Sequence, residues 1–482
     1  MTNRIDRRLF VTGSTLSAFH IFVMGCSAKR KPSGTEAVVR QASQAKPEPP
    51  TGLGDYVAHD GPVSPVGDFK YLVIQGGGDQ LSDGHIMGSQ PDGMACFQNA
   101  KGQYVLLRNQ ELGAQKFLSK YGVNDALFKG GKRPAGSYNE DMFGGVIRTV
   151  IDPKTLASDF KGEMGLRSKS VVESHYSLLG TDRNCAGGEF EGYWITCEES
   201  SAPGHGYSFL THKDDQGLVK PRRIDSWGRL HREAVCVHKA TGITYMTEDR
   251  RDGCFYRFVP KDKSKPFGVG QLQALKLGGT SVTDPYPDPV KGVKPTRIFT
   301  HGQSWSVSWV DVDDPSAEKH SCRAQAQAKG AATFNRCEGI TQDEEGIWFV
   351  ASLGGPAKAG QIFRLGQRDA EGAQRLFLAY EVDDTAVLSC PDNLVAAPWG
   401  DIVMAEDNYA ASDKVKTQHV RCMKKDGTIY PLLRLNNEGK GWRKAGPEFT
   451  GACFSPDGKY LFVNLQSPLN ITIAVTGPWP NS

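Results

Sequence analysis

Six short segments of this 482-residue sequence share one pattern. Each begins with a glycine, continues with a run in which aromatic or β-branched side chains alternate with others, and ends on a polar residue. Such alternation after a turn residue is typical of a β-strand. The glycines are Gly102, Gly192, Gly242, Gly346, Gly400 and Gly458, and the polar residues six positions later are Arg108, Glu198, Glu248, Ser352, Glu406 and Asn464. The pattern therefore predicts six strands that each end in a polar side chain.

A second short strand precedes each of these glycines and also begins near a polar or thiol group. These groups belong to Asp92, Cys185, Glu233, Glu338, Asp392 and Glu448. A hairpin of this span returns its second strand to the place where the first began, so both polar positions meet at one edge. Six such hairpins predict an all-β fold, a six-bladed β-propeller in which four-stranded sheets surround a central channel.

The propeller is expected over residues 63–482, which allows about 70 residues per blade against about 40 to 45 in compact propellers. Long inserted loops are therefore required, and the uneven glycine spacing places them between blades, near 113–140 and 261–332. The 55 glycines and 27 prolines favour many short strands joined by turns.

The first 62 residues are expected to lie outside the propeller. Arg7 and Arg8 precede a mildly apolar run that ends at Cys26, which predicts a twin-arginine or lipoprotein-type signal over 1–26 and a flexible tether over 27–62. An acylated Cys26 would anchor the protein to a membrane face, whereas a plain cleaved signal leaves that cysteine incidental. We expect export by the twin-arginine route and a periplasmic or lipid-anchored location in a bacterial envelope.

The net charge of +3 does not indicate nucleic-acid binding. Residues 1–50 contain eight basic and three acidic side chains, so the rest of the chain is slightly acidic. A slightly acidic body has no electrostatic footprint for a polyanion.

Carboxylates of all the hairpins are expected to converge on one mouth of the channel. The set contains Glu111, Glu198, Glu233, Glu248, Glu338, Asp392, Glu406 and Glu448, and Glu198, Glu248 and Glu406 are each followed by a second acid, Glu199, Asp249 and Asp407. So many negative charges repel one another unless cations neutralise them. Carboxylate oxygens favour hard ions such as Ca²⁺, Mg²⁺ or ferric iron, and Cys185 could add a thiolate. The alternatives are carboxylates that only accept hydrogen bonds in blade turns, and an inert buried cysteine.

The sequence resembles the PhoX-type alkaline phosphatases. The matching stretches are NCAGG (184–188), YWITCEE (193–199), HGY (205–207), GRLHREAV (228–235), TGITYMTEDRRDGCFYRFVP (241–260), FNRCEGI (334–340), PDNL (391–394) and EFTGACFSPDGKYLFVNLQSP (448–468).

The resemblance implies a propeller that holds ferric iron and calcium ions and hydrolyses small phosphate monoesters. It implies that Cys185 is an iron ligand, that Arg336 binds the substrate phosphate, and that Arg336, Cys185 and Glu338 are the catalytic residues. The implied metal ligands are Glu111, Cys185, Glu198, Glu233, Glu248 or Asp249, Glu338, Asp392, Glu406 or Asp407, and Glu448. We expect a metal-bound oxygen nucleophile and no covalent phosphoenzyme, because the sequence has no G-x-S-x-G motif that would mark a serine nucleophile. We also expect a monomer.

Two other functions remain open from the sequence. A calcium-dependent lactonase or esterase would need calcium alone, so iron content separates it from the phosphatase. A non-catalytic envelope propeller used for protein binding would hold structural calcium, and the crowded acidic strand ends argue against it.

Overall fold

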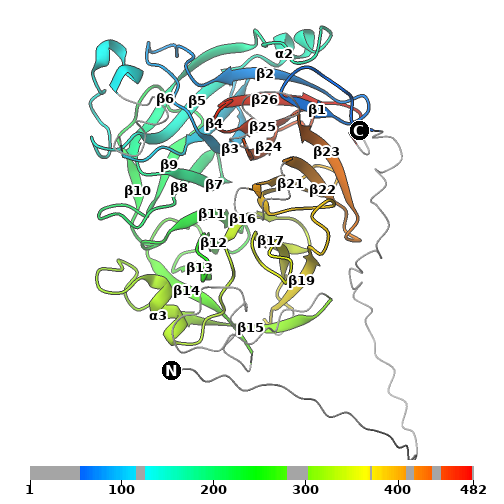
Figure 1. Cartoon of the computed structure of the whole chain (residues 1–482). Helices are drawn as coiled ribbons and strands as arrows, with labels where there is room; N and C mark the ends of the chain where they lie inside the picture. Colours follow the sequence, from blue (N-terminus) through cyan, green and yellow to red (C-terminus); the bar gives the residue numbers. More distant parts are fainter. Residues whose placement is uncertain are drawn as a thin grey trace, which may run out of the picture. The chain divides into compact units, whose positions relative to one another are not determined.

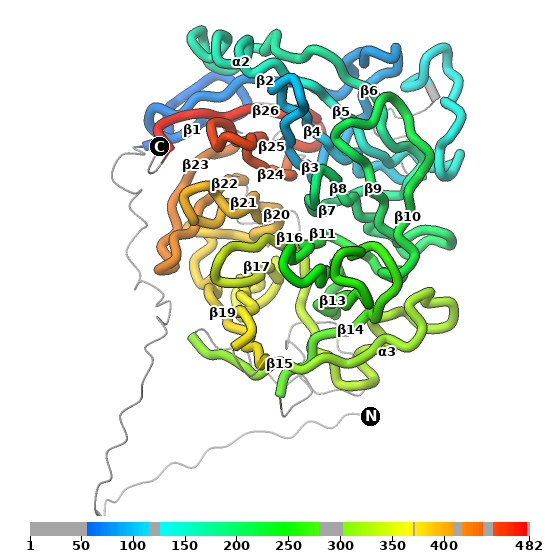
Figure 2. Tube along the Cα trace, turned by 180° about the vertical axis from the view of Figure 1, so that it is seen from behind, coloured from blue at the N-terminus to red at the C-terminus, as the bar shows by residue number. Residues whose placement is uncertain are grey.

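Hairpins that follow one another along the chain form sheets arranged around a common centre (Figure 1). The computed structural model describes residues 55–114, 125–278, 302–369, 372–408, 417–436 and 447–479, all within the unit Val39–Ser482. The predicted signal over 1–26 and the predicted tether as far as residue 54 lie outside the described residues. The view from behind shows the same arrangement of sheets (Figure 2).

Two four-stranded sheets come first along the chain. Their strands are β3 (Pro91–Gln98), β4 (Tyr104–Gln110), β5 (Gly144–Ile151) and β6 (Val171–Thr181), then β7 (Asn184–Phe190), β8 (Tyr193–Glu198), β9 (Ser208–His212) and β10 (Arg222–Ile224). In each sheet the strands pair in chain order, so β3 and β7 are the edge strands nearest the centre.

The middle of the described chain forms one nine-stranded sheet. Its two halves are β11 (Arg232–Val237), β12 (Thr244–Glu248), β13 (Phe255–Pro260), β14 (Gly270–Leu277), and β16 (Cys337–Gln342), β17 (Gly346–Ala351), β18 (Gln361–Gly366), β19 (Arg375–Glu381). Strand β15 (Ser304–Asp311) pairs with both β14 and β19 and so joins the outer edges of the halves.

The last two sheets bring the two ends of the described chain together. Their strands are β20 (Pro391–Ala396), β21 (Ile402–Glu406), β22 (His419–Met423), β23 (Ile429–Leu435) and β1 (Val63–Pro65), then β24 (Phe449–Phe454), β25 (Leu461–Leu465), β26 (Ile471–Thr476) and β2 (Lys70–Gly76). β1 and β2 complete sheets formed by C-terminal strands, β1 beside β23 and β2 beside β26.

The fold is therefore all-β and propeller-like, and every predicted hairpin is present. The pairs are β3–β4, β7–β8, β11–β12, β16–β17, β20–β21 and β24–β25. Each inner strand contacts the next inner strand, and β24 contacts β3, so the inner strands form a closed ring.

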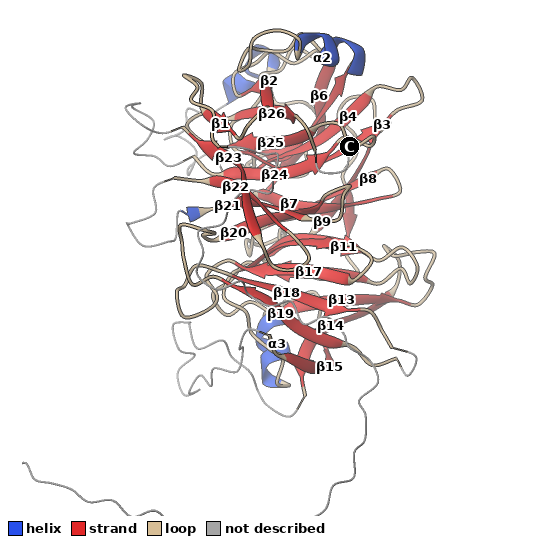
Figure 3. Cartoon of the chain, turned by 90° about the vertical axis from the view of Figure 1, so that its right-hand side faces the viewer, coloured by secondary structure: helices blue, strands red, loops and turns tan. Residues whose placement is uncertain are grey.

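Helices are few in the described residues (Figure 3). They are α2 (Pro153–Asp159), α3 (Cys322–Ala328) and the short 3₁₀ turns η2 (Asp125–Leu127) and η3 (Lys129–Gly131). No helix among these residues is long and apolar enough to cross a membrane. The turns η2 and η3 occupy the predicted insertion near 113–140, but it lies inside the first sheet, between β4 and β5, and not between two sheets.

The hydrophobic core lies between neighbouring sheets. One cluster packs Ile195 and Cys197 of β8 against Val235 of β11 and Met246 of β12. Residues 55–62, predicted to belong to the tether, contact the same unit: the backbone N–H of Val57 donates to the carbonyl of Pro65 at 2.8 Å. All ten cysteines of the described residues are free thiols.

Candidate metal and phosphate site

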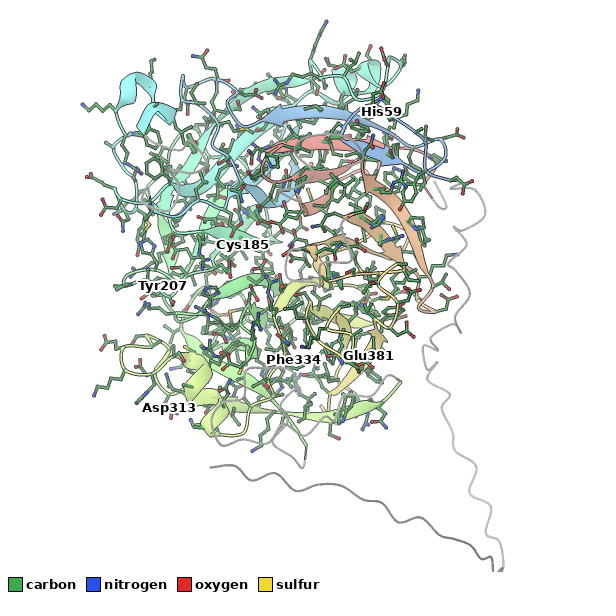
Figure 4. All side chains as sticks on the ribbon, in the orientation of Figure 1. His59, Cys185, Tyr207, Asp313, Phe334 and Glu381 are labelled. Carbon is green, nitrogen blue, oxygen red and sulfur yellow. The ribbon has the colours of Figure 1, made fainter. Side chains whose placement is uncertain are left out.

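A charged cavity of about 570 Å³ lies where the inner strands begin. Nine carboxylates line it, from Asp92, Glu111, Glu199, Glu233, Asp249, Glu338, Asp392, Asp407 and Glu448. The other lining residues are Cys185, Arg183, Arg336, Gln90, Gln466 and Ser467. Cys185 lies near the centre of the ring of sheets (Figure 4). A second cavity of about 370 Å³, lined by later residues of the same strands, has only Glu189 and Lys239 as charged lining residues.

The cavity is built by a backbone feature that recurs at all six hairpins. A β-bulge interrupts the register at the start of every inner strand. A bulge re-aims the side chains beside it and is common next to active sites. At each hairpin the N–H of the residue after the second strand donates to the carbonyl of the residue before the inner strand, as from Glu199 to Arg183 and from Asp407 to Cys390.

Glycines near the bulges allow the inner strands to approach closely. A Cβ atom on Gly93 of β3 would lie 2.6 Å from the Cα of Ala186 in β7, and one on Gly339 of β16 would lie 2.1 Å from the carbonyl oxygen of Asp392 in β20. Contacts this short are not possible for a side chain. The glycines therefore bring acidic groups of neighbouring strands within one coordination sphere.

The cavity contains four linked groups of possible metal ligands, and in each group the donor atoms lie within 4.8 Å of one another. The groups are Asp92–Glu111–Cys185, Cys185–Glu199–Glu233, Glu233–Glu338–Asp392 and Asp392–Asp407–Glu448. Cys185, Glu233 and Asp392 each belong to two groups, so the set forms a continuous arc. Such sharing is the arrangement expected for several cations side by side.

Without cations, the ionised carboxylates of the arc would be buried and would repel one another. Burial, reinforced by the neighbouring acids, raises the pKa values of Asp92, Glu233, Glu338, Asp392 and Glu448 well above their usual range. The same causes raise the pKa of Glu111 to about 7 and that of Glu199 to about 8. The buried atoms Oδ1 of Asp92 and Oε1 of Glu233 have no hydrogen-bond partner in the structure. Buried oxygens without donors fit hard cations, which bind carboxylates and need no proton.

Cys185 is held in place by its neighbours. The side-chain amide of Asn109 donates to the carbonyls of Cys185 and Ala186, at 2.7 and 2.9 Å, and the Trp194 indole N–H donates to Asn109 at 2.8 Å. Sγ of Cys185 lies 3.5 Å from Oδ2 of Asp92. Burial and the adjacent Asp92 raise the pKa of the thiol well above its usual value, so only a cation would favour its thiolate.

Three predicted ligands, Glu198, Glu248 and Glu406, do not line the cavity. Glu198 accepts from the backbone N–H groups of Asp182, Gly206 and Tyr207 and lies 2.7 Å from Nδ1 of His205. Glu248 accepts from the Tyr256 hydroxyl and Arg323, and Glu406 accepts from the N–H groups of Ser389 and His419. Their carboxylates are already satisfied by hydrogen bonds within and between the sheets.

The residue after each of these three acids faces the cavity instead. Successive side chains of a strand point to opposite sides, so Glu199, Asp249 and Asp407 enter the cavity where Glu198, Glu248 and Glu406 turn away. Asp249 and Asp407 were the alternatives left open by the sequence. The sequence pattern identified Glu199 only as the acid that follows Glu198. It identified Asp92 only as the polar residue at the start of a predicted strand, and neither was among the predicted ligands.

Arg336 lies among the acids on one side of the cavity. Its Nε and Nη2 donate to both carboxylate oxygens of Asp249 at 3.0 and 3.1 Å, and Nε is 3.2 Å from Glu338. Nη1 is 3.6 Å from Asp407. Although burial opposes it, Arg336 lowers the pKa of Asp249 below its usual value. The planar guanidinium thus faces the cavity with its charge balanced by three carboxylates.

Arg183 is a second cavity-lining arginine that was not among the predicted site residues. It occupies the same place before β7 as Arg336 does before β16, so the repeat itself could have revealed it. Its Nη2 lies 2.8 Å from Nε2 of His231. Burial, with the charges of Arg250 and Arg183, lowers the pKa of His231 to about 4, so the ring is neutral and Nε2 can accept this hydrogen bond.

Sequence comparison identifies the family. The family model of the alkaline phosphatase PhoX matches residues 57–469, which is most of the chain. The chain belongs to the PhoX alkaline phosphatase family. As a member of that family it is an alkaline phosphatase, and PhoX phosphatases act on phosphate esters.

One solved structure supports the fold of this member of the PhoX family, and two others are only distantly similar. Pseudomonas fluorescens PhoX in complex with vanadate, a transition state analogue, is 18% identical with a TM-score of 0.59, and the match covers 88% of this chain and 98% of that one. Staphylococcus aureus virginiamycin B lyase is 10% identical with a TM-score of 0.36, covering 85% and 100%. A Xanthomonas campestris gluconolactonase is 12% identical with a TM-score of 0.35, covering 88% and 100%. A comparison with curated protein sequences finds no match.

Proposed function

We propose that the protein is a phosphomonoester hydrolase that uses a calcium and iron cluster held by the carboxylates and Cys185 in the mouth of a six-bladed propeller. The observation that carries the proposal is the arc of four linked acidic groups flanked by cavity-lining arginines. The vanadate complex of the Pseudomonas fluorescens protein supports a phosphoryl-transfer site in a fold of this kind.

The six-blade count is supported by the inner hairpins. The two halves of the nine-stranded sheet each have their own inner pair, β11–β12 and β16–β17, and β15 joins only their outer edges. Counting one blade for each inner hairpin, we propose six blades in these five sheets.

The donor atoms fit two kinds of cation. Groups composed only of carboxylates, such as Glu233–Glu338–Asp392, suit Ca²⁺, whereas the two groups that contain Cys185 suit iron, which accepts a thiolate. When bound, such ions would neutralise phosphate oxygens and lower the pKa of a water molecule. Our ligand assignment is Asp92, Glu111, Cys185, Glu199, Glu233, Glu338, Asp392, Asp407 and Glu448.

The protein's own residues would position the phosphate. Arg336 presents a planar guanidinium that can donate to two phosphate oxygens, and Glu338 and Asp249 fix its orientation from below. Attack by water, without a covalent phosphoenzyme, agrees with the assignment of Cys185 as a metal ligand and with the absence of a G-x-S-x-G motif from the sequence. We further propose that the protein is a monomer that is exported by the twin-arginine route and carries a lipid anchor at Cys26.

Metal analysis combined with an assay of phosphate release tests this function. The purified protein should contain calcium and iron and should hydrolyse p-nitrophenyl phosphate, and the Arg336→Lys variant should lose about tenfold or more in kcat/KM, because lysine cannot form the bidentate contact. Arg375→Lys is the matched control, since Arg375 lies on β19 and hydrogen bonds to Ser304, outside the cavity. Calcium without iron, together with hydrolysis of a lactone but not of the phosphate ester, would reject the proposal.

A further inference from the structure

The two arginines that line the cavity each lie directly before an inner strand. The residues directly before β7, β11 and β16 are Arg183, His231 and Arg336, whereas Gln90, Cys390 and Glu448 stand in the same place before β3, β20 and β24. Both arginines of the cavity therefore lie in one half of the ring, on either side of the neutral His231. A dianionic ester would place its phosphate between them.

Arg183 and Arg336 share an unusual backbone conformation. Their φ angles are +50° and +57°, in the left-handed region that non-glycine residues rarely adopt. In both cases the carbonyl accepts a hydrogen bond from the residue after the neighbouring strand, Glu199 and Ser352 respectively. Gln90 and Cys390 adopt the same conformation before β3 and β20, so the repeat places the backbone of both arginines at equivalent positions in their sheets.

The guanidinium of Arg183 is less fully engaged than that of Arg336. Its Nη2 donates to the carbonyl of Glu199 and to Nε2 of His231, but Nη1 approaches a carboxylate only at 3.8 Å, the Oε2 of Glu199. The side chain of Arg183 is 41% exposed, against 22% for Arg336. Nη1 can therefore donate to a ligand at the cost of only this one long ion pair with Glu199.

The two arginines flank different halves of the acidic arc. Arg183 acts electrostatically on Glu199, Glu111 and Cys185, which belong to the first two acidic groups. Arg336 contacts Glu338 and Asp407, which belong to the last two groups. Both arginines act on Glu199, so this carboxylate lies within the field of each. A phosphate above the middle of the arc would be approached by one arginine from each side.

We propose that Arg183 is a second phosphate-binding arginine, which donates from Nη1 to a substrate oxygen opposite the one that Arg336 contacts. This inference rests on the proposed phosphatase function. His231, whose Nδ1 lies 3.0 Å from Oε1 of Glu199, would position the Arg183 guanidinium from behind. Arg183 would then contribute to binding of the ester, of phosphate and of the transition state.

Three variants test the proposal. Arg183→Gln should raise the KM for p-nitrophenyl phosphate and the inhibition constant of vanadate by about tenfold or more, because a charge-assisted hydrogen bond is lost. Arg183→Lys should recover part of the vanadate affinity, since it keeps the charge. Arg223→Gln is the control, because Arg223 of β10 forms an ion pair with Asp225 and does not line the cavity. Both Arg183 variants should bind as much calcium and iron as the wild type.

Two results would overturn the role of Arg183. One is unchanged KM and vanadate inhibition in Arg183→Gln, and the other is loss of metal from both Arg183 variants, which would show that the residue only holds Glu199 in place. Direct titration of each protein with vanadate separates this inference from the proposed function. A wild-type protein that hydrolyses no phosphate ester would reject the proposed function, while its vanadate affinity would still report on Arg183.

Discussion

Two adjacent glutamates at the end of β8 differ completely in environment. Glu198 is fully buried and accepts hydrogen bonds from three backbone N–H groups, whereas Glu199 lines the charged cavity and lies near Arg183 and His231. Because successive side chains on a strand point to opposite sides, one carboxylate stabilises the turn after β8 while the next is available to a cation.

Replacing each glutamate by glutamine should separate these two roles. Glu198→Gln should lower the free energy of unfolding by about 1–3 kcal/mol, because the amide nitrogen would face N–H donors. Glu199→Gln should instead reduce bound metal and lower kcat/KM by about tenfold or more, the effect expected for loss of a metal-site group. Urea unfolding and metal analysis of both variants provide the measurement. Equal metal loss from the two variants would contradict the assignment.

At the level of elements, the decisive feature is the bulge at the start of each inner strand, together with the glycines beside it. Gly93 illustrates the constraint, because its Cα faces the backbone of Cys185 and Ala186 in the next sheet. Strand β3 therefore approaches β7 more closely than any residue with a side chain would allow.

Gly93→Ala should force β3 and β7 apart. We expect the free energy of unfolding to fall by about 1–3 kcal/mol, as for overpacking elsewhere, and iron content to fall with it because Cys185 would shift away from Asp92. Gly162→Ala is the control, since Gly162 is exposed and a Cβ there would meet only the carbonyl oxygen of Asp159, at 3.2 Å. Thermal unfolding and iron analysis test this, and an iron content equal to that of the wild type would count against the close-approach argument.

The hairpins could be predicted from the sequence because a turn glycine followed by alternating apolar residues is a local signal. The sequence could not predict whether the acid at the end of each strand points into the cavity or away from it. That direction depends on the β-bulge and on the hydrogen-bond donors that the acid meets. Thus the sequence left both Glu406 and Asp407 open as the metal ligand, and the N–H groups of Ser389 and His419 bind Glu406 outside the cavity. Arg183 was missed although the sequence repeat places it directly before β7, where Arg336 stands before β16.

On the scale of the whole molecule, the acidic arc joins parts of the chain that are far apart in sequence. Asp92 lies at the start of β3 and Glu448 directly precedes β24, yet both lie in the same cavity. Cations bound between such groups would connect neighbouring sheets around the ring. Bound metal is therefore expected to stabilise the closed arrangement of sheets as well as to take part in catalysis.

The metal-free protein should become less stable as the pH rises from 5.5 to 8.5. The pKa of Glu111 is raised from 4.5 to about 7 and that of Glu199 from 4.5 to about 8, chiefly by burial, so across this range the folded state holds protons that the unfolded chain has released. The unfolded state then binds fewer protons, and the free energy of unfolding falls with pH, by on the order of 3 kcal/mol for Glu199 alone. Urea unfolding after chelation should show this decline, and adding calcium at pH 8.5 should reverse it because cations replace the protons. Metal-free protein that is more stable at pH 8.5 than at pH 5.5 would show that these carboxylates are not held in mutual repulsion.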